Sequence, residues 1–315
     1  MQSNKPGIVF VTGGNGRLGS RLCTELVAKG YEVRALVASK ERINTLPAGV
    51  IPFVGTLDDT GVLVEAAEGA DIVVHTASVI STSKATASEM KHVNVDGTKN
   101  VVNACVSSGC KRLVFTSSID VYGKKRKGVI NERTQPKPTD KYGYSKLAAE
   151  REVVGSGLAY TILRLATIYG PSFEKSFFKV FKAISEGKIA IIGKGNNHLA
   201  LVHVIDALRA VERAMQCEQC VGQTYNVSDG VAYTQEGLID LAADMLHVAR
   251  PARHVSEALV ALLAKKRGLD SDELRFLTSD RVIDISKIRR DAGFEPSVEM
   301  TVGGGELVQM FLGSR

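Results

Sequence analysis

The chain has 315 residues, 44% of them hydrophobic and 23% charged, as in an ordinary globular protein, and no apolar run approaches the ~18 residues that span a bilayer. The net charge of +6 comes from basic residues interleaved with acids, and no basic helix carries aromatics spaced for base stacking, which argues against nucleic acid as a partner. The first residues lack the apolar stretch of a signal peptide, so we expect a cytoplasmic protein without membrane insertion.

The first half of the chain alternates between short β-branched runs and stretches with helical spacing. The strand-like runs lie at residues 8–11, 33–37, 50–54, 72–75, 113–116 and 160–165. Strands that alternate with helices predict a parallel sheet covered on both faces, because each parallel crossover needs a helix. The nearly continuous apolar strands agree with burial on both sides. We therefore predict an α/β fold with a doubly wound parallel sheet.

The first strand runs into a glycine-rich turn and then a helix. The turn reads Thr12-Gly13-Gly14-Asn15-Gly16-Arg17-Leu18-Gly19. Glycines allow the backbone to turn sharply and to approach a pyrophosphate, which then lies at the positive end of the helix. A strand before and a helix after are the context that such a motif requires. We predict dinucleotide binding here.

The end of the second strand bears on the choice of cofactor. An NAD site usually carries an acid there, but residues 36–38 are Leu, Val and Ala. Ser39, Lys40 and Arg42 follow, and Arg17 lies in the glycine turn. A basic edge without an acid tolerates a 2′-phosphate, which favours NADP, with NAD as the alternative. Farther on, Asp58 and Asp59 either approach the adenine or cap a helix.

Hydroxyl groups mark the end of the strand at 113–116. Ser117 and Ser118 follow this strand directly. Ligands of parallel sheets gather at the carboxyl ends of the strands, so these hydroxyls are expected near the nicotinamide. A serine there can hold a substrate oxygen by a hydrogen bond.

Tyr142 and Lys146 open an alanine- and glutamate-rich helical stretch. Residues four apart lie on one helix face. We expect the lysine ammonium to lower the pKa of the phenol, normally about 10, so that the tyrosine exchanges a proton with an alcohol or carbonyl oxygen. Tyr144 lies only two residues from Lys146 and faces elsewhere.

The pattern loosens after residue 170. We predict a dinucleotide-binding domain over residues 1–170 and a smaller, mostly helical substrate lobe over 171–315, with some segments returning to the first domain. Helical stretches are expected at 235–247 and 255–266. The pair Cys217 and Cys220 has CxxC spacing, but no second pair or nearby histidine completes a metal site, so we expect free thiols and no metal.

Several motifs stand in order along the chain and together resemble one family. They are Thr12-Gly13-x-x-Gly16-x-x-Gly19, His75-Thr-Ala-Ser78, Asn94-Val-Asp-Gly-Thr98, Ser117-Ser118-x-x-Val121-Tyr122-Gly123, Tyr142-Gly-x-Ser-Lys146, Leu163-Arg164-x-x-x-Ile168-Tyr169-Gly170-Pro171, Val202-His-Val-x-Asp206 and Tyr225-Asn-Val-Ser228. The sequence resembles the extended short-chain dehydrogenases/reductases of the NAD-dependent epimerase/dehydratase superfamily over nearly its whole length.

The resemblance implies a Rossmann domain that binds NAD(P), with Ser118, Tyr142 and Lys146 as catalytic residues. Ser118 is preferred to Ser117 because it stands four residues before Tyr122, as in the pattern of the family, and Ser117 is the alternative. The cofactor contacts implied are Gly13, Asn15, Gly16, Arg17, Leu18, Gly19, Ser39, Lys40, Leu57, Thr76, Ala77, Ser78, Tyr142, Lys146 and Thr167. Asn94 and Asp206 match positions where side chains tie loops to the sheet. The resemblance also implies a homodimer that pairs through helices near residues 88–107 and 142–154.

Three departures bear on the substrate. Leu199 and Ala200 stand where nucleotide-sugar enzymes of the family carry an arginine–aspartate pair, and Thr167 stands where they carry asparagine. Their late arginine–glycine–aspartate segment is replaced by residues 277–284. Loss of the arginine removes a charge-assisted contact of roughly 1.5–3 kcal/mol. The segment 277–284 and the ending 291–296 are more similar to the 3β-hydroxysteroid dehydrogenase/isomerase branch, with the dihydroflavonol reductases close behind.

We therefore expect an NAD(P)-dependent oxidoreductase that interconverts a secondary alcohol and a carbonyl on a hydrophobic, hydroxysteroid-like small molecule. The predicted substrate contacts are Ser118, Ile119, Asp120, Leu199 and Leu201. The alternatives are a nucleotide-sugar epimerase or dehydratase and a non-catalytic redox sensor that only binds the cofactor. The basic run at 124–127 is read as a solvated loop, with contact to an anionic group of the substrate as the alternative.

Overall fold

A parallel sheet forms the centre of the molecule. The computed structural model describes residues 7–80, 84–260, 262 and 276–314. Among these residues, seven strands pair side by side, all in parallel. Their order across the sheet is β12 (Gln223–Val227), β7 (Tyr160–Leu165), β5 (Arg112–Ser118), β4 (Ile72–His75), β1 (Ile8–Thr12), β2 (Glu32–Val37) and β3 (Val50–Val54). This confirms the predicted doubly wound Rossmann sheet.

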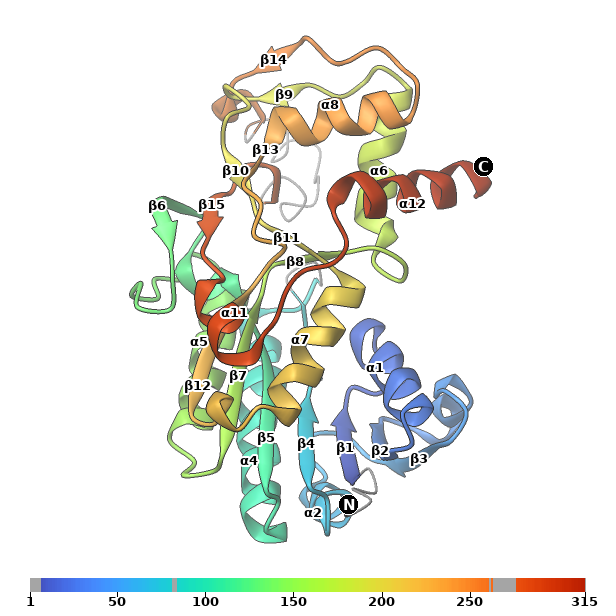
Figure 1. The fold of residues 1–315 in the computed structure, drawn as a ribbon, viewed down its shortest axis with the longest axis vertical. Helices are drawn as coiled ribbons and strands as arrows, with labels where there is room; N and C mark the ends of the chain where they lie inside the picture. Colours follow the sequence, from blue (N-terminus) through green and yellow to red (C-terminus); the bar gives the residue numbers. More distant parts are fainter. Residues whose placement is uncertain (1–6, 81–83, 261, 263–275, 315) are drawn as a thin grey trace.

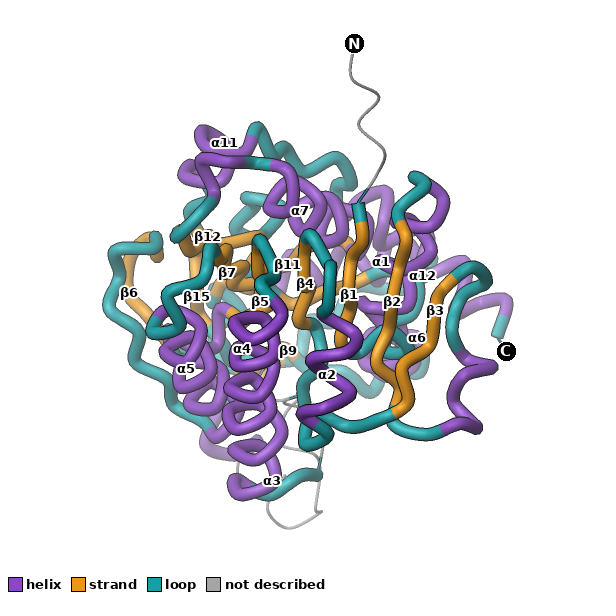
Figure 2. The backbone as a smooth tube through the Cα atoms, turned by 90° about the horizontal axis from the view of Figure 1, so that it is seen from below, coloured by secondary structure: helices purple, strands orange, loops and turns teal. Residues whose placement is uncertain are grey.

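Helices cover both faces of the sheet (Figure 2). One face carries α2 (Thr60–Ala67), α4 (Gly97–Ser108) and α5 (Lys141–Val154), and the other carries α1 (Arg17–Ala28), α7 (Val204–Gln216) and α11 (Ser286–Ala292). Successive residues of a strand point to opposite faces, so Val9 and Val11 pack toward α1 and α7 whereas Phe10 packs toward α2 and α4. The two apolar faces explain why the strands read as unbroken hydrophobic runs.

The rest of the chain builds a smaller lobe beyond the carboxyl ends of the strands (Figure 1). Its core lies among α6 (Glu174–Ser185), α8 (Gln235–Met245) and α12 (Met300–Gly313). Two-stranded pairs surround this core. They are β8 (Thr167–Tyr169) with β11 (Leu201–His203), β9 (Ile191–Ile192) with β14 (His254–Val255), β10 (His198–Leu199) with β13 (Tyr233–Thr234), and β6 (Lys125–Ile130) with β15 (Asp280–Ile283).

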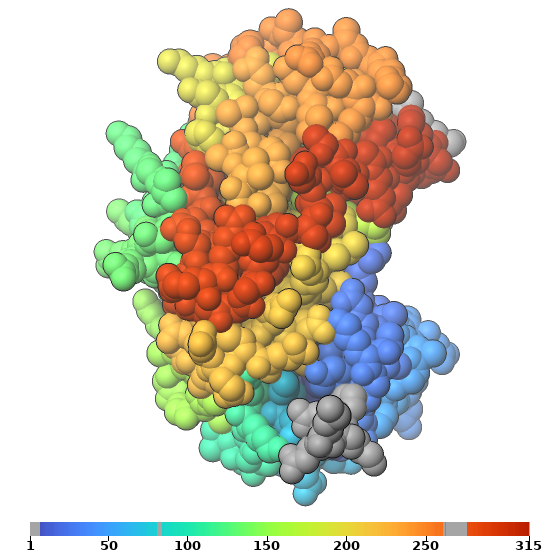
Figure 3. All heavy atoms as spheres, viewed as in Figure 1, coloured from blue at the N-terminus to red at the C-terminus, as the bar shows by residue number. Residues whose placement is uncertain are grey.

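The chain passes between the two parts several times. The space-filling view shows the red residues that contain α11 lying against the lower, sheet-bearing half, although α12 belongs to the lobe (Figure 3). The strand β12 forms an edge of the central sheet, so a segment well past residue 170 returns to it.

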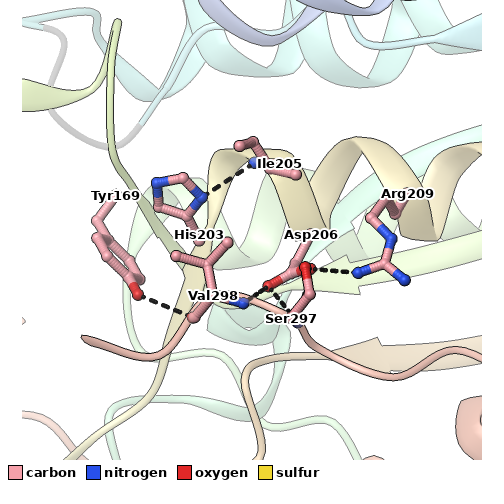
Figure 4. A network of polar contacts seen from close by, with 7 residues as sticks. All are labelled: Tyr169, His203, Ile205, Asp206, Arg209, Ser297 and Val298. Carbon is pink, nitrogen blue, oxygen red and sulfur yellow. Dashed lines mark hydrogen bonds and ion pairs between the residues drawn. The ribbon is translucent and has the colours of Figure 1, made fainter. Parts of the chain in front are cut away.

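A buried aspartate fastens the lobe to the sheet-bearing half (Figure 4). Asp206, in the first turn of α7, is fully buried and accepts hydrogen bonds from the backbone of Ser297 and Val298 and from the Ser297 hydroxyl. The half-exposed Arg209 adds a contact of 3.1 Å, and the Tyr169 hydroxyl donates to the Val298 carbonyl. Asp206 thus holds the segment that leads into α12.

Two predictions about helices and membranes can be compared with the structure. The helix expected at 235–247 is α8. In the stretch 255–266, Val255 belongs to β14, residues 257–260 are helical, and most of the remainder lies outside the described residues. Within the part of the chain that the structure describes, no helix is long and apolar enough to cross a membrane.

Candidate active site

The glycine turn has the tight geometry expected of a pyrophosphate site. Gly13 has φ +74°, and the Gly16 amide donates to its carbonyl at 2.8 Å. A Cβ on Gly19 would lie 2.1 Å from that same carbonyl oxygen, so only glycine fits there. The backbone at Gly13 therefore lies close against the first turn of α1. The amides of a helix's first turn have no partner within the helix, so they can bind an anion.

A single cavity of about 900 Å³ begins at this turn and extends past α5 to the start of α6. The predicted cofactor contacts that line it, apart from Tyr142 and Lys146, are Gly13, Asn15, Gly16, Arg17, Leu18, Gly19, Leu57, Thr76, Ala77, Ser78 and Thr167. Its volume and the glycine turn in its lining fit a dinucleotide, with room left for a substrate.

Where the cavity passes the end of β2, the structure does not bring all of the predicted basic residues together. Ala38 and Arg42 line the cavity, but Ser39 and Lys40 do not. Ser39 precedes a 3₁₀ turn, Lys40–Thr45, and this turn carries Arg42 rather than Lys40 to the wall. Arg17 lies with its guanidinium 4.8 Å from the ring centre of Phe173.

The two aspartates after Leu57 have different positions. Asp58 lines the cavity, and its Oδ2 lies 3.0 Å from Nε2 of His92. Asp59 stands at the N-cap of α2, but its carboxylate accepts hydrogen bonds from the amide and hydroxyl of Thr56. These bonds hold the pKa of Asp59 below its usual range. Asp58 is therefore the aspartate of the pair that faces the cofactor space.

The three predicted catalytic residues line the same cavity. Ser118 ends β5, and its hydroxyl accepts from the Asp120 amide at 3.1 Å. Tyr142 and Lys146 lie on successive turns of α5, which begins where the Asp140 carboxylate caps the Gly143 amide at 2.9 Å. The carboxyl end of the strand and the first turns of the helix thus bring the serine, tyrosine and lysine to one wall.

Burial dominates the proton affinities of this wall. It raises the pKa of Tyr142 above its ordinary value, an effect that the charge of Asp120 increases and the hydroxyls of Ser118 and Ser78 oppose. Burial also lowers the pKa of Lys146 to about 7. The expectation that Lys146 lowers the pKa of Tyr142 is therefore not met, because burial disfavours the charged form of both groups.

A buried histidine supports the floor beneath the site. His75 ends β4, with its ring nitrogens 2.6 Å from the Thr12 hydroxyl and 2.9 Å from the Thr98 hydroxyl. Burial, with the charge of Lys146 nearby, lowers the pKa of His75 to about 3, so the ring is neutral. His75 consequently ties two strands to α4.

Asn94 secures the adjoining loop. It accepts from the Val79 amide at 2.7 Å and the Ser78 hydroxyl, and it donates to the Ser145 hydroxyl on α5. This asparagine holds the loop after β4 against the helix that carries Tyr142, as its motif position implies.

The substrate end of the cavity differs from the one expected. Ile119 and Asp120 line it, but Leu199 and Leu201 do not. Both leucines lie on short strands and are buried in the interior of the protein, Leu201 within the core of the lobe. The wall at this end comes instead from Ile80, Ile168, Phe173, Ser176 and Phe177. The sequence analysis did not identify Phe173 and Phe177, although their spacing of four residues around the start of a helix could have indicated a shared face.

Asp120 is held by an arginine from far along the chain. Arg281 on β15 lies 2.6 Å from its Oδ1 and is almost fully buried. The nearby basic run at 124–127 is part of β6 and its approach and does not line the cavity. Lys125 pairs there with Glu257 at 2.6 Å. This position agrees with the surface reading of the run rather than with substrate contact.

Comparison with known proteins gives the family. Residues 9–228 match the NAD dependent epimerase/dehydratase family, to which the chain therefore belongs. It is 29% identical to a 3-beta-hydroxysteroid dehydrogenase of Mycolicibacterium neoaurum, over 92% of this chain and 87% of that protein. It is 28% identical to the 4-hydroxy-2-methyl-3-oxo-4-farnesyl-3,4-dihydroquinoline-1-oxide ketoreductase of Stigmatella aurantiaca, over 90% and 91%.

Nucleotide-sugar enzymes are equally near in structure. DesIV, a dTDP-glucose 4,6-dehydratase from Streptomyces venezuelae solved with NAD and TYD bound, superposes with a TM-score of 0.80 at 25% identity over 98% of both chains. The protein is thus an enzyme of the NAD-dependent dehydrogenase, reductase and epimerase type that acts on CH–OH groups.

Proposed function

We propose that the protein is an NAD(P)-dependent oxidoreductase that interconverts a secondary alcohol and a ketone on an apolar small molecule. The observation that carries this proposal is the meeting of Ser118, Tyr142 and Lys146 on one wall of a cavity whose other end is the glycine turn. When bound, the nicotinamide cofactor would supply or accept the hydride at the substrate carbon.

Each of the three residues has a distinct role in this proposal. The Ser118 hydroxyl holds the substrate oxygen. Tyr142 takes the hydroxyl proton during oxidation as the phenolate and, as the neutral phenol, returns it during reduction. Lys146, in its charged form, stabilises the phenolate of Tyr142, and it would donate to the ribose of a bound cofactor. Because burial raises the pKa of Tyr142 and lowers that of Lys146, oxidation is expected to become faster with rising pH only as long as Lys146 keeps its charge.

The walls of the substrate end support an apolar substrate. Ile80, Ile119, Ile168, Phe173 and Phe177 supply hydrocarbon surface, and Ser176 and Asp120 add polar groups beside the catalytic hydroxyls. A flat, hydroxysteroid-like alcohol buries more of its surface against such walls than a diphosphate does. The chain is similar to a 3-beta-hydroxysteroid dehydrogenase and to a ketoreductase whose name specifies a substrate with a farnesyl group. Both similarities support an apolar substrate.

A nucleotide-sugar epimerase or dehydratase is the second candidate. The structural match to a dTDP-glucose dehydratase favours it, and Asp120 offers an acceptor for a sugar hydroxyl. The reaction would begin with the same oxidation at the Tyr142 wall.

Turnover and binding distinguish the two candidates. Purified protein with cofactor is given a panel of 3β-hydroxysteroids, bulky ketones and uridine- or thymidine-diphosphate sugars, and both the nicotinamide absorbance and the melting temperature are followed. A ligand that binds the native state raises the melting temperature. Oxidation of the steroids with no shift from the sugars supports the first candidate, and stabilisation by the sugars alone supports the second.

NADP is the proposed cofactor, with NAD as the alternative. Arg42 lines the cavity just beyond β2, and no acid occupies residues 36–38. A guanidinium there can pair with a 2′-phosphate, whereas a carboxylate would repel it.

A homodimer is the proposed assembly. The apolar side chains of Val106 on α4 and of Tyr144 and Val154 on α5 are more than half exposed. Two copies that pair these helices would bury all three side chains in a four-helix interface. Sedimentation of the protein should give the mass of two chains, and replacing Val106 and Val154 by glutamate should give one.

A further inference from the structure

Several motif residues have no part in the proposed reaction and yet lie together behind it. Ser117, Tyr122, Arg164 and Asn226 all belong to motifs of the sequence, and the structure joins them to Glu150 of α5 in one buried network. Each of the five is at least nine-tenths buried. Burying charged and polar side chains raises the free energy of the folded protein unless each group has a partner. A buried network in contact with the catalytic helix therefore suggests a functional role.

Glu150 is the centre of this network. Arg164 on β7 donates to both of its carboxylate oxygens, at 2.9 and 2.6 Å, and the Ser117 hydroxyl donates at 2.6 Å. A planar guanidinium that binds both oxygens fixes the orientation of the carboxylate. These bonds together fix the orientation of the Glu150 carboxylate.

Arg164 is positioned in turn by Tyr122. Its guanidinium lies 4.8 Å from the centre of the Tyr122 ring and donates to the Tyr122 hydroxyl at 2.7 Å. That hydroxyl donates in turn to Asn226 at 2.8 Å. The position of the carboxylate is thus set by residues of β5, the turn after it, β7 and β12 together.

Lys146 lies one helical turn before Glu150. In the described part of the chain it forms no ion pair, and its ammonium instead lies 4.3 Å from the centre of the Phe115 ring. Burial disfavours its charge, and Glu150 is the group that opposes this effect.

Among the described residues, the other groups around Lys146 supply no negative charge. His75 on β4 is neutral, Tyr142 on its own helix is protonated, and Arg164 lies beyond the Glu150 carboxylate. Asp120 and Asp140 act on Tyr142.

We propose that Glu150, fixed by Arg164 and Ser117, is a positioning residue that keeps Lys146 charged and in place for the cofactor and Tyr142. Ser117 then serves the lysine through Glu150, whereas Ser118 serves the substrate. The inference rests on the proposed role of Lys146 in the reaction, but its principal test needs neither substrate nor turnover.

The test is the protonation of Lys146 in the cofactor-free protein. Competitive acetylation with acetic anhydride at a series of pH values, with the Lys146 peptide quantified by mass spectrometry, gives the midpoint at which the amine becomes reactive. For the wild type we expect a midpoint near 7. In Glu150→Gln it should fall by about one unit, which makes Lys146 about fivefold more reactive at pH 6. An unchanged midpoint would overturn the proposal.

Two further variants protect the test from misfolding. The double variant Glu150→Gln with Arg164→Gln removes both charges and leaves two amides that can pair. It should also lower the midpoint, but by less than Glu150→Gln, because the positive charge of Arg164 is lost as well. Asp206→Asn removes another buried carboxylate, the one that fastens the lobe, and should leave the midpoint unchanged. An equal shift in Asp206→Asn would mean that loosening of the fold, not Glu150, governs Lys146.

Cofactor binding provides the second measurement. Fluorescence titration with NADPH should show affinity falling as pH rises through the midpoint of Lys146, and falling at lower pH in Glu150→Gln. If the labelling midpoint shifts while Tyr142→Phe retains full turnover, Glu150 keeps its role and the proposed reaction fails instead.

Discussion

Arg281 and Asp120 stand 161 residues apart in the sequence and 2.6 Å apart in the structure. The carboxylate of Asp120 raises the pKa of Tyr142, and the guanidinium neutralises part of that charge. In Arg281→Met the charge of Asp120 is uncompensated, so the pKa of Tyr142 should rise further and oxidation should require higher pH. We expect kcat/KM of the oxidation at pH 7 to fall about tenfold for each unit of this rise, because the fraction of Tyr142 present as phenolate falls by the same factor. Lys125→Met, which breaks an exposed ion pair nearby, should leave the pH profile of kcat/KM unchanged.

Replacement of Tyr142 by Phe should abolish most of the activity. The ring remains, but the group that exchanges the proton is lost, so turnover should fall by ~10²-fold or more. The dissociation constant of the cofactor should change little. Tyr144→Phe, on the exposed side of the same helix, is the matched control and should retain turnover. Comparable rates for the two variants would remove Tyr142 from its role.

Arg42, rather than Lys40, should determine the preference for NADPH. Only Arg42 lines the cavity, so Arg42→Ala should reduce the ratio of NADPH to NADH affinity several-fold, whereas Lys40→Ala should leave it unchanged. Fluorescence titration with both cofactors measures the ratio. A wild type that prefers NADH would show that Arg42 does not meet a phosphate.

Gly19→Ala should prevent cofactor binding. The added Cβ would lie 2.1 Å from the Gly13 carbonyl oxygen, and neither backbone can move without opening the turn. Gly61→Ala, on α2 with no atom within 4 Å of the added methyl, should change the free energy of unfolding by roughly 1 kcal/mol or less and leave binding intact. Calorimetric titration with the cofactor distinguishes the two variants.

Asp206→Asn should weaken the attachment of the lobe. The fully buried carboxylate accepts from Ser297 and Val298, and an amide satisfies only part of this set, so we expect a loss of roughly 3 kcal/mol in the free energy of unfolding. Arg209→Ala removes only the partly exposed partner and should cost roughly 1 kcal/mol or less. Urea denaturation followed by circular dichroism measures both losses.

The sheet could be predicted because its signal is local. Each buried strand is a short β-branched run, and the observed strands lie within a residue or two of the predicted ones, as at Tyr160–Leu165. Tyr142 and Lys146 were predictable for a related reason, since four residues of helix always place two side chains on one face.

What the sequence did not reveal depends on distant packing. Leu199 and Leu201 are apolar whether they line a cavity or fill a core, and only the short strands around them decide for the core. The pairing of Asp120 with Arg281 requires β15 to lie beside β6, which no local pattern indicates. The pKa of Tyr142 was misjudged because desolvation depends on the whole surrounding wall.

The continuous cavity makes the two ligands partners in one binding equilibrium. Ser118, Tyr142 and Lys146 border the same space as the glycine turn, so a bound nicotinamide ring would form part of the surface that the substrate contacts. Whatever factor the cofactor adds to the affinity for substrate, the substrate must add to the affinity for cofactor. Where each ligand increases the affinity for the other, release of one product lowers the affinity for the second. The rate of product release therefore depends on both ligands together.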